Sequence, residues 1–225
     1  MKRRFLLNVA ALCLSAATML GTAQAAGSPT KVRIQTSLGT IDAELFADKA
    51  PRTVANFVQY VQDKHYDGTV FHRVIANFMV QGGGYDSQLR ERPTRAPVQH
   101  EGRAAYAAGL RNSTGTLAMA RTNDPHSATA QFFINVVDNA FLDPTPIPEG
   151  DPVKRFEYQG RVYENLPRSQ LLNATQLFGY TVFGKVTSGM DVVQKIRQTP
   201  TGSGGPFPTD VPKTPVIIQS ITLLP

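Results

Sequence analysis

The sequence predicts a single domain of mainly β structure. Its 225 residues fit the size of one domain with a substantial core. Most apolar residues fall in short runs that alternate with polar residues, and glycine and proline separate these runs, as is typical of strands joined by turns. About eight such runs occur with only two helical stretches, without an internal repeat and without a regular alternation of strand and helix. This order argues against a parallel α/β sheet.

The first predicted elements are a hairpin and a helix. Residues 32–36 and 40–46 each alternate apolar and polar side chains, and the Ser-Leu-Gly segment between them predicts a turn. Residues 50–64 predict a helix, with Pro51 suited to its first turn. Its apolar residues have the spacing of one helix face that packs on a core: Val54, Phe57, Val58 and Val61.

Two short strands are predicted next, at residues 70–75 and 78–81, and three glycines at 82–84 end the second one. The remaining strands are expected at residues 116–120, 131–136, 180–187 and 216–224, with a second helix at 189–199. Loops are expected at residues 86–112, with a helical turn at 102–109, and at 200–215. Residues 143–178 contain five prolines and mixed charges, which favours an excursion on the surface over a core element.

The two central strands present an unusual mixture of side chains. Because alternate residues of a strand share a face, Arg73 is expected to lie with Phe71 and Ile75, and Met79 with Gln81. A surface that is mostly apolar but carries two hydrogen-bonding side chains is typical of a site for a neutral, partly apolar substrate.

The N-terminus has the pattern of a secretory signal peptide. Residues 2–4 are basic, residues 5–20 are mostly apolar, and Ala23-Gln24-Ala25 is a small-residue cleavage pattern, so we expect cleavage after Ala25 and a mature domain of residues 26–225. A membrane anchor is the alternative, but the apolar run is interrupted by polar residues and is short beside the ~20 residues of a spanning helix. The mature chain would lack cysteine, because Cys13 lies in the leader, and would therefore have no disulfide.

Several other chemistries are disfavoured. Without the leader, 20 Lys and Arg stand against 17 Asp and Glu, and a net charge of +3 is too small to indicate nucleic-acid binding. The four histidines lack the spacing of zinc ligands, and His72 is expected on the strand face opposite Arg73, in a structural role. The glycines at 82–84 lack the Lys-Ser/Thr of a phosphate-binding loop.

Three parts of the chain resemble the signature segments of the cyclophilin family, in that family's order. They are Thr69 to Tyr85, then Gly115 to Thr122 with Ser127 to Asn135, and finally Val182 to Val186 with Gly189 to Val193. The resemblance extends over roughly residues 31–224. It implies a closed eight-stranded antiparallel barrel capped by two helices, and a peptidyl-prolyl cis/trans isomerase that needs no cofactor. Exported bacterial cyclophilins are the most similar members, which implies a location in the periplasm or outside the cell.

The same resemblance implies a set of site residues. Arg73 and Gln81 match the catalytic positions, Arg73 as a permanently charged donor to the prolyl nitrogen and Gln81 as a donor to a substrate carbonyl. The backbone at Arg121 matches the edge that binds the peptide. The substrate-binding positions as a whole, including those of the proline pocket, correspond to Phe78, Met79, Ala120, Arg121, Gln131, Phe133, Phe141, Leu142 and Tyr180. Taken singly, most of these apolar residues are more often core than pocket, and their joint occurrence carries the interpretation.

Two positions depart from the well-studied cytosolic members of the family. Phe141 replaces a tryptophan and Tyr180 replaces a histidine, as in bacterial exported cyclophilins. We therefore expect isomerase activity to persist. Cyclosporin binding is expected to be weak, because phenylalanine has no counterpart to the indole N–H.

The interval 143–178 is much shorter in most of the family, so we interpret it as an insertion of unknown purpose. It sustains a rival hypothesis, in which the chain is a non-catalytic chaperone or adaptor that binds proline-containing segments in the same groove. The expected partners in either case are proline-containing peptides and unfolded exported proteins, without nucleic acid and without stable membrane insertion once the leader is removed.

Overall fold

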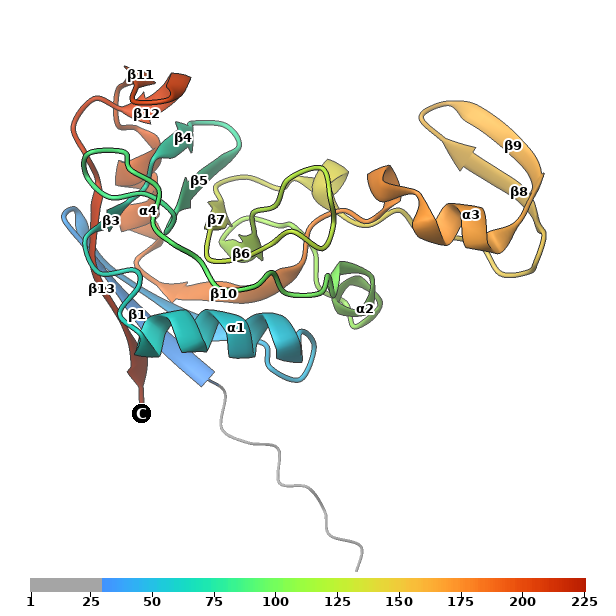
Figure 1. The fold of residues 1–225 in the computed structure, drawn as a ribbon, viewed down its shortest axis with the longest axis horizontal. Helices are drawn as coiled ribbons and strands as arrows, with labels where there is room; N and C mark the ends of the chain where they lie inside the picture. Colours follow the sequence, from blue (N-terminus) through green and yellow to red (C-terminus); the bar gives the residue numbers. More distant parts are fainter. Residues whose placement is uncertain (1–29) are drawn as a thin grey trace, which may run out of the picture.

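The computed structural model describes residues 30–225 and is organised around one curled antiparallel sheet of nine strands (Figure 1). The strands of this sheet are β1 (Thr30–Thr36), β2 (Gly39–Leu45), β3 (Thr69–Val70), β4 (Arg73–Ile75), β5 (Met79–Gly82), β6 (Thr116–Met119), β7 (Phe132–Asn135), β10 (Val182–Ser188) and β13 (Ile217–Leu224). Their order across the sheet is β3-β13-β1-β2-β10-β6-β7-β5-β4. The predicted signal peptide lies outside the described residues.

The first hairpin and both long helices confirm the predictions from sequence. β1 and β2 pair in register from Thr30 opposite Leu45 to Thr36 opposite Gly39. The two longest helices are α1 (Pro51–Gln62) and α4 (Met190–Arg197), and each buries its apolar face in the main core. Four α-helices are present in the described chain, since α2 (Gly102–Ala107) forms at the predicted helical turn and α3 (Arg168–Asn173) was not predicted.

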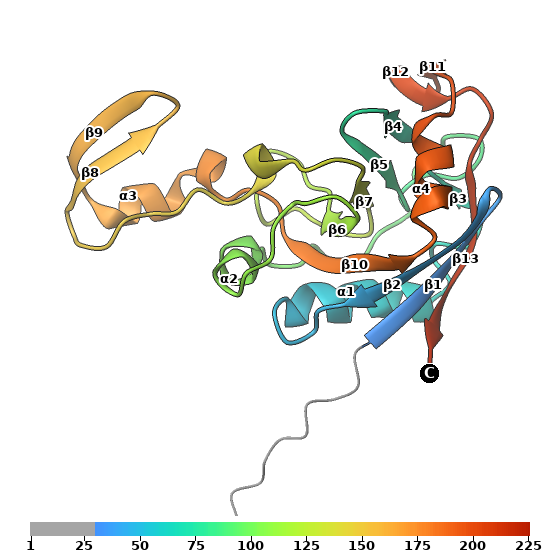
Figure 2. The same cartoon turned by 180° about the vertical axis from the view of Figure 1, so that it is seen from behind.

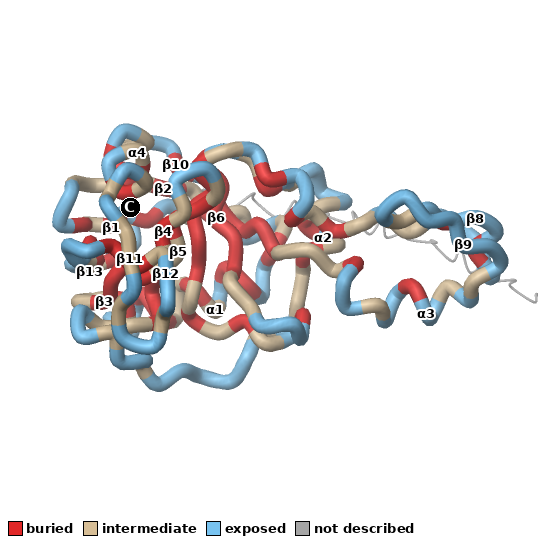
Figure 3. The backbone as a smooth tube through the Cα atoms, turned by 90° about the horizontal axis from the view of Figure 1, so that it is seen from above, coloured by how far each residue is buried: buried red, intermediate tan, exposed pale blue. Residues whose placement is uncertain are grey.

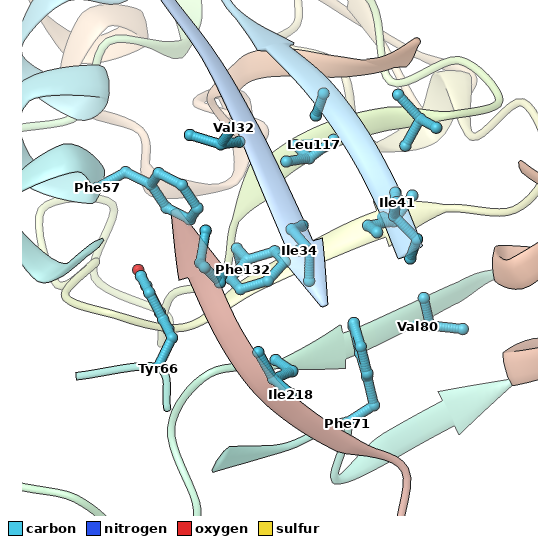
Figure 4. Close-up of a cluster of buried hydrophobic side chains, with 14 of the residues drawn as sticks. Val32, Ile34, Ile41, Phe57, Tyr66, Phe71, Val80, Leu117, Phe132 and Ile218 are labelled. Carbon is cyan, nitrogen blue, oxygen red and sulfur yellow. The ribbon is translucent and has the colours of Figure 1, made fainter. Parts of the chain in front are cut away.

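The main core fills the concave interior of the sheet. Phe57 of α1 lies at its centre, with ring centroids 5.1 Å from Tyr66, 5.5 Å from Phe132 and 5.1 Å from Phe183. Figure 4 shows the rings of Phe57, Tyr66 and Phe132 beside branched aliphatic side chains from the strands. Full burial of each such side chain contributes roughly 1.5–3 kcal/mol, so this cluster is the main source of stability.

The strand predicted at residues 70–75 is interrupted, which changes both the strand count and the prediction of closure. Phe71 donates its backbone N–H to Val216 O at 2.9 Å and turns its fully buried ring into the main core, so that β3 and β4 become separate strands. β3 pairs with β13 and β4 pairs with β5, and among residues 30–225 no ladder joins β3 to β4. The sheet is therefore a curled, partly open barrel of nine strands, and closure into the expected eight-stranded barrel is not shown.

Residues 143–178, which we call the excursion, project from the body of the sheet (Figures 1 and 2). The excursion begins after the short 3₁₀ helix η1 (Ala140–Leu142) and contains β8 (Val153–Tyr158), β9 (Arg161–Leu166), α3 and the 3₁₀ helix η2 (Thr175–Leu177). It has a small apolar cluster of its own, separate from the main core: Val153, Phe156, Leu171 and Leu177. Much of its remaining surface is exposed (Figure 3).

The loop predicted at residues 200–215 is wrong. The segment forms a hairpin of β11 (Thr201–Gly204) and β12 (Phe207–Pro212), which lies beside β4 at one end of the sheet. Gly205, with a φ of +51°, allows the tight turn between the two strands. The prolines of β12 are compatible with a two-stranded ribbon because a strand at an edge has N–H groups that need no ladder partner.

Candidate active site

A cavity of about 410 Å³ opens on the outer face of β4, β5 and β7, on the side of the sheet away from the main core. All eleven site residues predicted from the sequence line it, although they come from positions 73 to 180. Three further residues, which were not predicted, complete the lining: His72, Tyr85 and Phe207.

Strand pairing places the two polar residues on the cavity face. Arg73 of β4 lies directly opposite Gln81 of β5, and Ile75 lies opposite Met79. The alternate residues, Val74 and Val80, pack in the main core. The prediction that Arg73 shares a face with Ile75, and Met79 with Gln81, is confirmed. Phe71 was wrongly placed on that face, because the interruption of the strand turns its ring into the core.

A chain of polar contacts crosses the cavity. Arg73 Nη1 lies 3.5 Å from Gln81 Oε1, and Gln81 donates from Nε2 to Gln131 Oε1 at 3.0 Å. The first of these contacts is long and therefore weak. The side chain of Arg73 is 43% exposed, so its guanidinium N–H groups can turn toward a ligand without the loss of a strong internal hydrogen bond.

The apolar part of the cavity is a second cluster of side chains on the outside of the sheet. Met79, Phe133 and Leu142 are buried there together, and the Phe133 and Tyr180 rings meet edge to face with centroids 5.6 Å apart. Phe78 stacks against Phe141 at 5.5 Å, and the Phe141 side chain is 74% exposed at the lip of the cavity. The cavity thus combines a buried apolar base with an exposed aromatic rim.

The position of Tyr180 is fixed by its neighbours. Arg121 donates from Nε and Nη2 to Gly179 O at 3.0 and 2.9 Å, and its guanidinium lies 4.6 Å from the centroid of the Tyr180 ring. His100 Nε2 also lies 3.2 Å from Gly179 O. The side chain of Arg121 is therefore held at this corner, and both Ala120 and Arg121 line the cavity.

His72 lines the cavity beside Arg73, so its predicted placement on the opposite face is wrong. It precedes β4, in the interruption where regular alternation does not apply. Its ring is stacked on Phe207 at 5.4 Å and tilted against Tyr85 at 4.6 Å. Burial lowers the pKa of His72 to about 4, so the ring is neutral at neutral pH.

The sequence offered unequal signals for the three missed residues. Tyr85 and His72 lie in the same stretch as Arg73 and Gln81, so proximity could have suggested them. Phe207 lies in the segment taken for a loop, more than a hundred residues from the central strands, and no local pattern points to the cavity.

Within residues 30–225 no group of three or more histidine, cysteine or acidic side chains is arranged to hold a metal ion. The same part of the chain has no helix that is long and apolar enough to cross a bilayer.

The curled sheet and its partly apolar cavity define a β protein with a candidate binding site on the side of the sheet away from the main core. Residues 31–223 match the family described as "Cyclophilin type peptidyl-prolyl cis-trans isomerase/CLD". The chain belongs to this family.

Named relatives agree with this assignment. The chain is 47% identical to a peptidyl-prolyl cis-trans isomerase of Streptomyces antibioticus over 86% of this chain and 98% of the relative. It is 44% identical to peptidyl-prolyl cis-trans isomerase B of Escherichia coli over 85% and 98% of the two chains, and 42% identical to peptidyl-prolyl cis-trans isomerase A of Dickeya dadantii over 92% and 91%. A crystal structure of a Cryptosporidium parvum cyclophilin covers 88% of this chain and 99% of its own, with a TM-score of 0.58 and 22% identity. That structure supports the fold alone.

Proposed function

We propose that the protein is a peptidyl-prolyl cis/trans isomerase that accelerates rotation about X-Pro bonds in exported polypeptides. The observation that carries the proposal is the pairing of Arg73 with Gln81 beside an apolar pocket built from Met79, Phe133 and Leu142. The named relatives are isomerases of the same family, which supports the same reaction.

The reaction needs neither a nucleophile nor a metal. Rotation breaks amide resonance, whose barrier is about 18–20 kcal/mol, and the prolyl nitrogen regains a lone pair as the bond twists. A donor aimed at that nitrogen binds the twisted state better than the planar one and so lowers the barrier. Arg73 takes this role because its guanidinium faces the cavity and its donors are charged.

The other residues hold the substrate. Gln81 donates to the carbonyl that precedes the proline, while Gln131 fixes the orientation of the Gln81 amide through their 3.0 Å hydrogen bond. Flat and flexible apolar side chains grip the prolyl ring, which suits Phe133 and Met79. The backbone of Ala120 and Arg121 forms the edge along which the extended peptide lies.

The magnitude is consistent with this small set of groups. A turnover rate in the ordinary enzyme range requires about 4–7 kcal/mol off the uncatalysed barrier. Loss of one preorganised donor in a dry site costs about 10²–10³-fold in rate. Because Arg73 is 43% exposed, solvent screens part of its effect and the lower end, about 10²-fold, applies.

The N-terminal leader supports a location in the periplasm or outside the cell. Residues 2–25 have the signal-peptide pattern, and the family match begins only at residue 31. The mature enzyme would begin at Ala26 and meet polypeptides that are folding after export.

A second candidate function is that of a chaperone or adaptor that holds proline-containing segments. The excursion favours it, because both of its ends adjoin the cavity: Tyr180 donates its backbone N–H to Leu142 O at 2.9 Å, and both residues line the cavity. Arg73 argues for catalysis, since simple binding of a neutral segment does not require a permanent positive charge at this point.

The test compares the cis-to-trans rate of a short X-Pro peptide with the chain from Ala26 and with its Arg73→Ala variant. We expect acceleration by the first and a loss of about 10²-fold in kcat/KM in the second. Arg33→Ala is the matched control, because Arg33 is 46% exposed and ion-paired as well but lies on β1. A folded protein that does not accelerate the conversion would refute the isomerase and favour the chaperone. Equal losses in both variants would refute the role of Arg73.

A further inference from the structure

The β11–β12 hairpin, which contributes Phe207 to the cavity, has an irregular register. Gly202 pairs with Val211 and Gly204 pairs with Phe207, so that Ser203 alone stands opposite three residues of β12, Pro208 to Asp210. Extra residues on one strand form a bulge, and bulges commonly redirect a side chain beside an active site.

Asp210 is the residue that this bulge redirects. Its φ of +68° lies in the left-handed region, which costs free energy in every residue except glycine and is best tolerated by asparagine and aspartate. Val211, next to it, is 7% exposed and anchors the strand. The backbone thus holds a strained conformation at the one acidic residue of β12.

The carboxylate of Asp210 faces the guanidinium of Arg73. Asp210 Oδ2 lies 3.9 Å from Arg73 Nε. Within residues 30–225, Asp210 is the acidic residue that forms an ion pair with Arg73. The contact uses the Nε edge of the guanidinium, while Nη1 on the other side is directed at Gln81. Because the guanidinium is planar, a partner on one edge restricts where the remaining N–H groups point.

We propose that Asp210 is a positioning residue for Arg73: it holds the Nε edge so that the terminal N–H groups face the prolyl nitrogen of the substrate. This inference rests on the proposed function. Asp210 itself is not among the residues that line the cavity, so it acts through Arg73 and not on the peptide. Phe207 of the same strand does line the cavity, so the β11–β12 hairpin also contributes a side chain to the cavity wall.

The ion pair has two opposing effects on the rate, one electrostatic and one conformational. The carboxylate lowers the positive potential at Arg73, and it also restricts a long side chain that is 43% exposed and otherwise samples many rotamers. At 3.9 Å, with both groups partly exposed, solvent weakens both effects, but even a small error in the position of a donor reduces a rate, so the expected loss is modest. We therefore expect loss of Asp210 to lower the rate.

The test uses Asp210→Asn in the chain from Ala26. Asparagine keeps the size of the side chain and tolerates the left-handed backbone, and only the charge is removed. We expect kcat/KM for an X-Pro peptide to fall about three- to tenfold. The affinity for the peptide, followed by NMR titration, should be unchanged because Asp210 does not contact it.

Three comparisons separate positioning from a structural role. Asp210→Gly removes the backbone strain, so it should unfold at the same or a higher temperature and yet lose the same activity. In an Arg73→Ala background, Asp210→Asn should have no further effect on the rate. Asp42→Asn, which breaks the 2.8 Å ion pair with Arg33 on the far hairpin, should leave the rate unchanged.

Each alternative outcome has a definite meaning. An active wild-type protein whose Asp210→Asn variant is equally active overturns the role of Asp210 and leaves the proposed function intact. An additive loss in the Arg73→Ala background shows that Asp210 does not act through Arg73, and it too overturns the inference. A folded wild-type protein without isomerase activity overturns the proposed function itself.

Discussion

Replacement of His72 by phenylalanine should make the protein less sensitive to acid. The His72 ring is 2% exposed, and among residues 30–225 its Nδ1 has no hydrogen-bond partner. Phenylalanine keeps the aromatic packing on Phe207 and Tyr85 and removes the titrating group. The change therefore isolates the cost of protonating a buried imidazole.

The size of the effect follows from the pKa of His72. Burial lowers this pKa to about 4 in the folded protein, whereas an unfolded histidine titrates near its usual value of about 6.5. Between these values the unfolded state binds a proton that the folded state does not, so the free energy of unfolding decreases as the pH falls from about 6.5 to 4. At pH 4.5, relative to pH 7.5, the loss due to His72 is about 2.5 kcal/mol.

The assay is chemical denaturation at pH 7.5 and pH 4.5, with the variant compared to wild type at each pH. The wild-type protein should lose about 2.5 kcal/mol more than His72→Phe over this interval. His100, whose pKa burial also lowers to about 4, contributes equally to both proteins and cancels. An equal loss in wild type and variant would refute the argument that His72 is buried in the neutral form.

Three further predictions concern packing, backbone and the excursion. Phe133→Ala should lower the free energy of unfolding by about 3 kcal/mol and raise KM for X-Pro peptides. Phe141→Ala should leave the free energy of unfolding nearly unchanged, because Phe141 is 74% exposed. Chemical denaturation and peptide kinetics measure both effects, and equal losses of stability in the two variants would contradict the burial of Phe133. Gly189→Ala should cost more than about 2 kcal/mol, because a Cβ there meets the carbonyl oxygen of Thr40 at a φ of +85°. Gly109→Ala, at a φ of +91° with open space around it, should cost only the backbone strain of about 1 kcal/mol, and equal costs would rule out the clash. Replacement of residues 146–176 by a short glycine linker should leave the sheet folded and the activity on short peptides intact. The linker can be short because Thr145 N and Leu177 O are already 3.1 Å apart, and the apolar cluster of the excursion is separate from the main core. Loss of the near-UV circular dichroism of the core in this variant would contradict the prediction.

Local patterns in the sequence were sufficient for the elements whose side chains repeat regularly. The alternation in residues 32–36 and 40–46 predicted the β1–β2 hairpin, since one face of each strand is buried and the other is solvated. The apolar stripe of residues 50–64 predicted α1 for the same reason. Alternation also predicted that Arg73 shares a face with Ile75 and Met79 with Gln81, and the strand pairing then brings Arg73 opposite Gln81.

Prediction failed where tertiary contacts override the local pattern. Phe71 lies in the same apolar run as β4. Its ring packs in the main core and its backbone N–H donates to Val216 O, so the strand is interrupted there. The glycines and prolines of residues 200–215 indicated a loop, yet they form β11 and β12 at the edge of the fold. In the excursion, five prolines masked a hairpin and a helix that stabilise each other through the Phe156 and Leu171 side chains.

Residue types at fixed spacing predicted the order of the main strands, and the resemblance to the cyclophilin family gave the family and eleven of the fourteen residues that line the cavity. Tertiary contacts decide that no ladder joins β3 to β4 within residues 30–225, that His72 is neutral at the cavity, and that Asp210 lies near Arg73. These features depend on burial, on contacts between segments more than a hundred residues apart, or on an interruption in a strand. None of these produces a periodic pattern of residue types in the sequence.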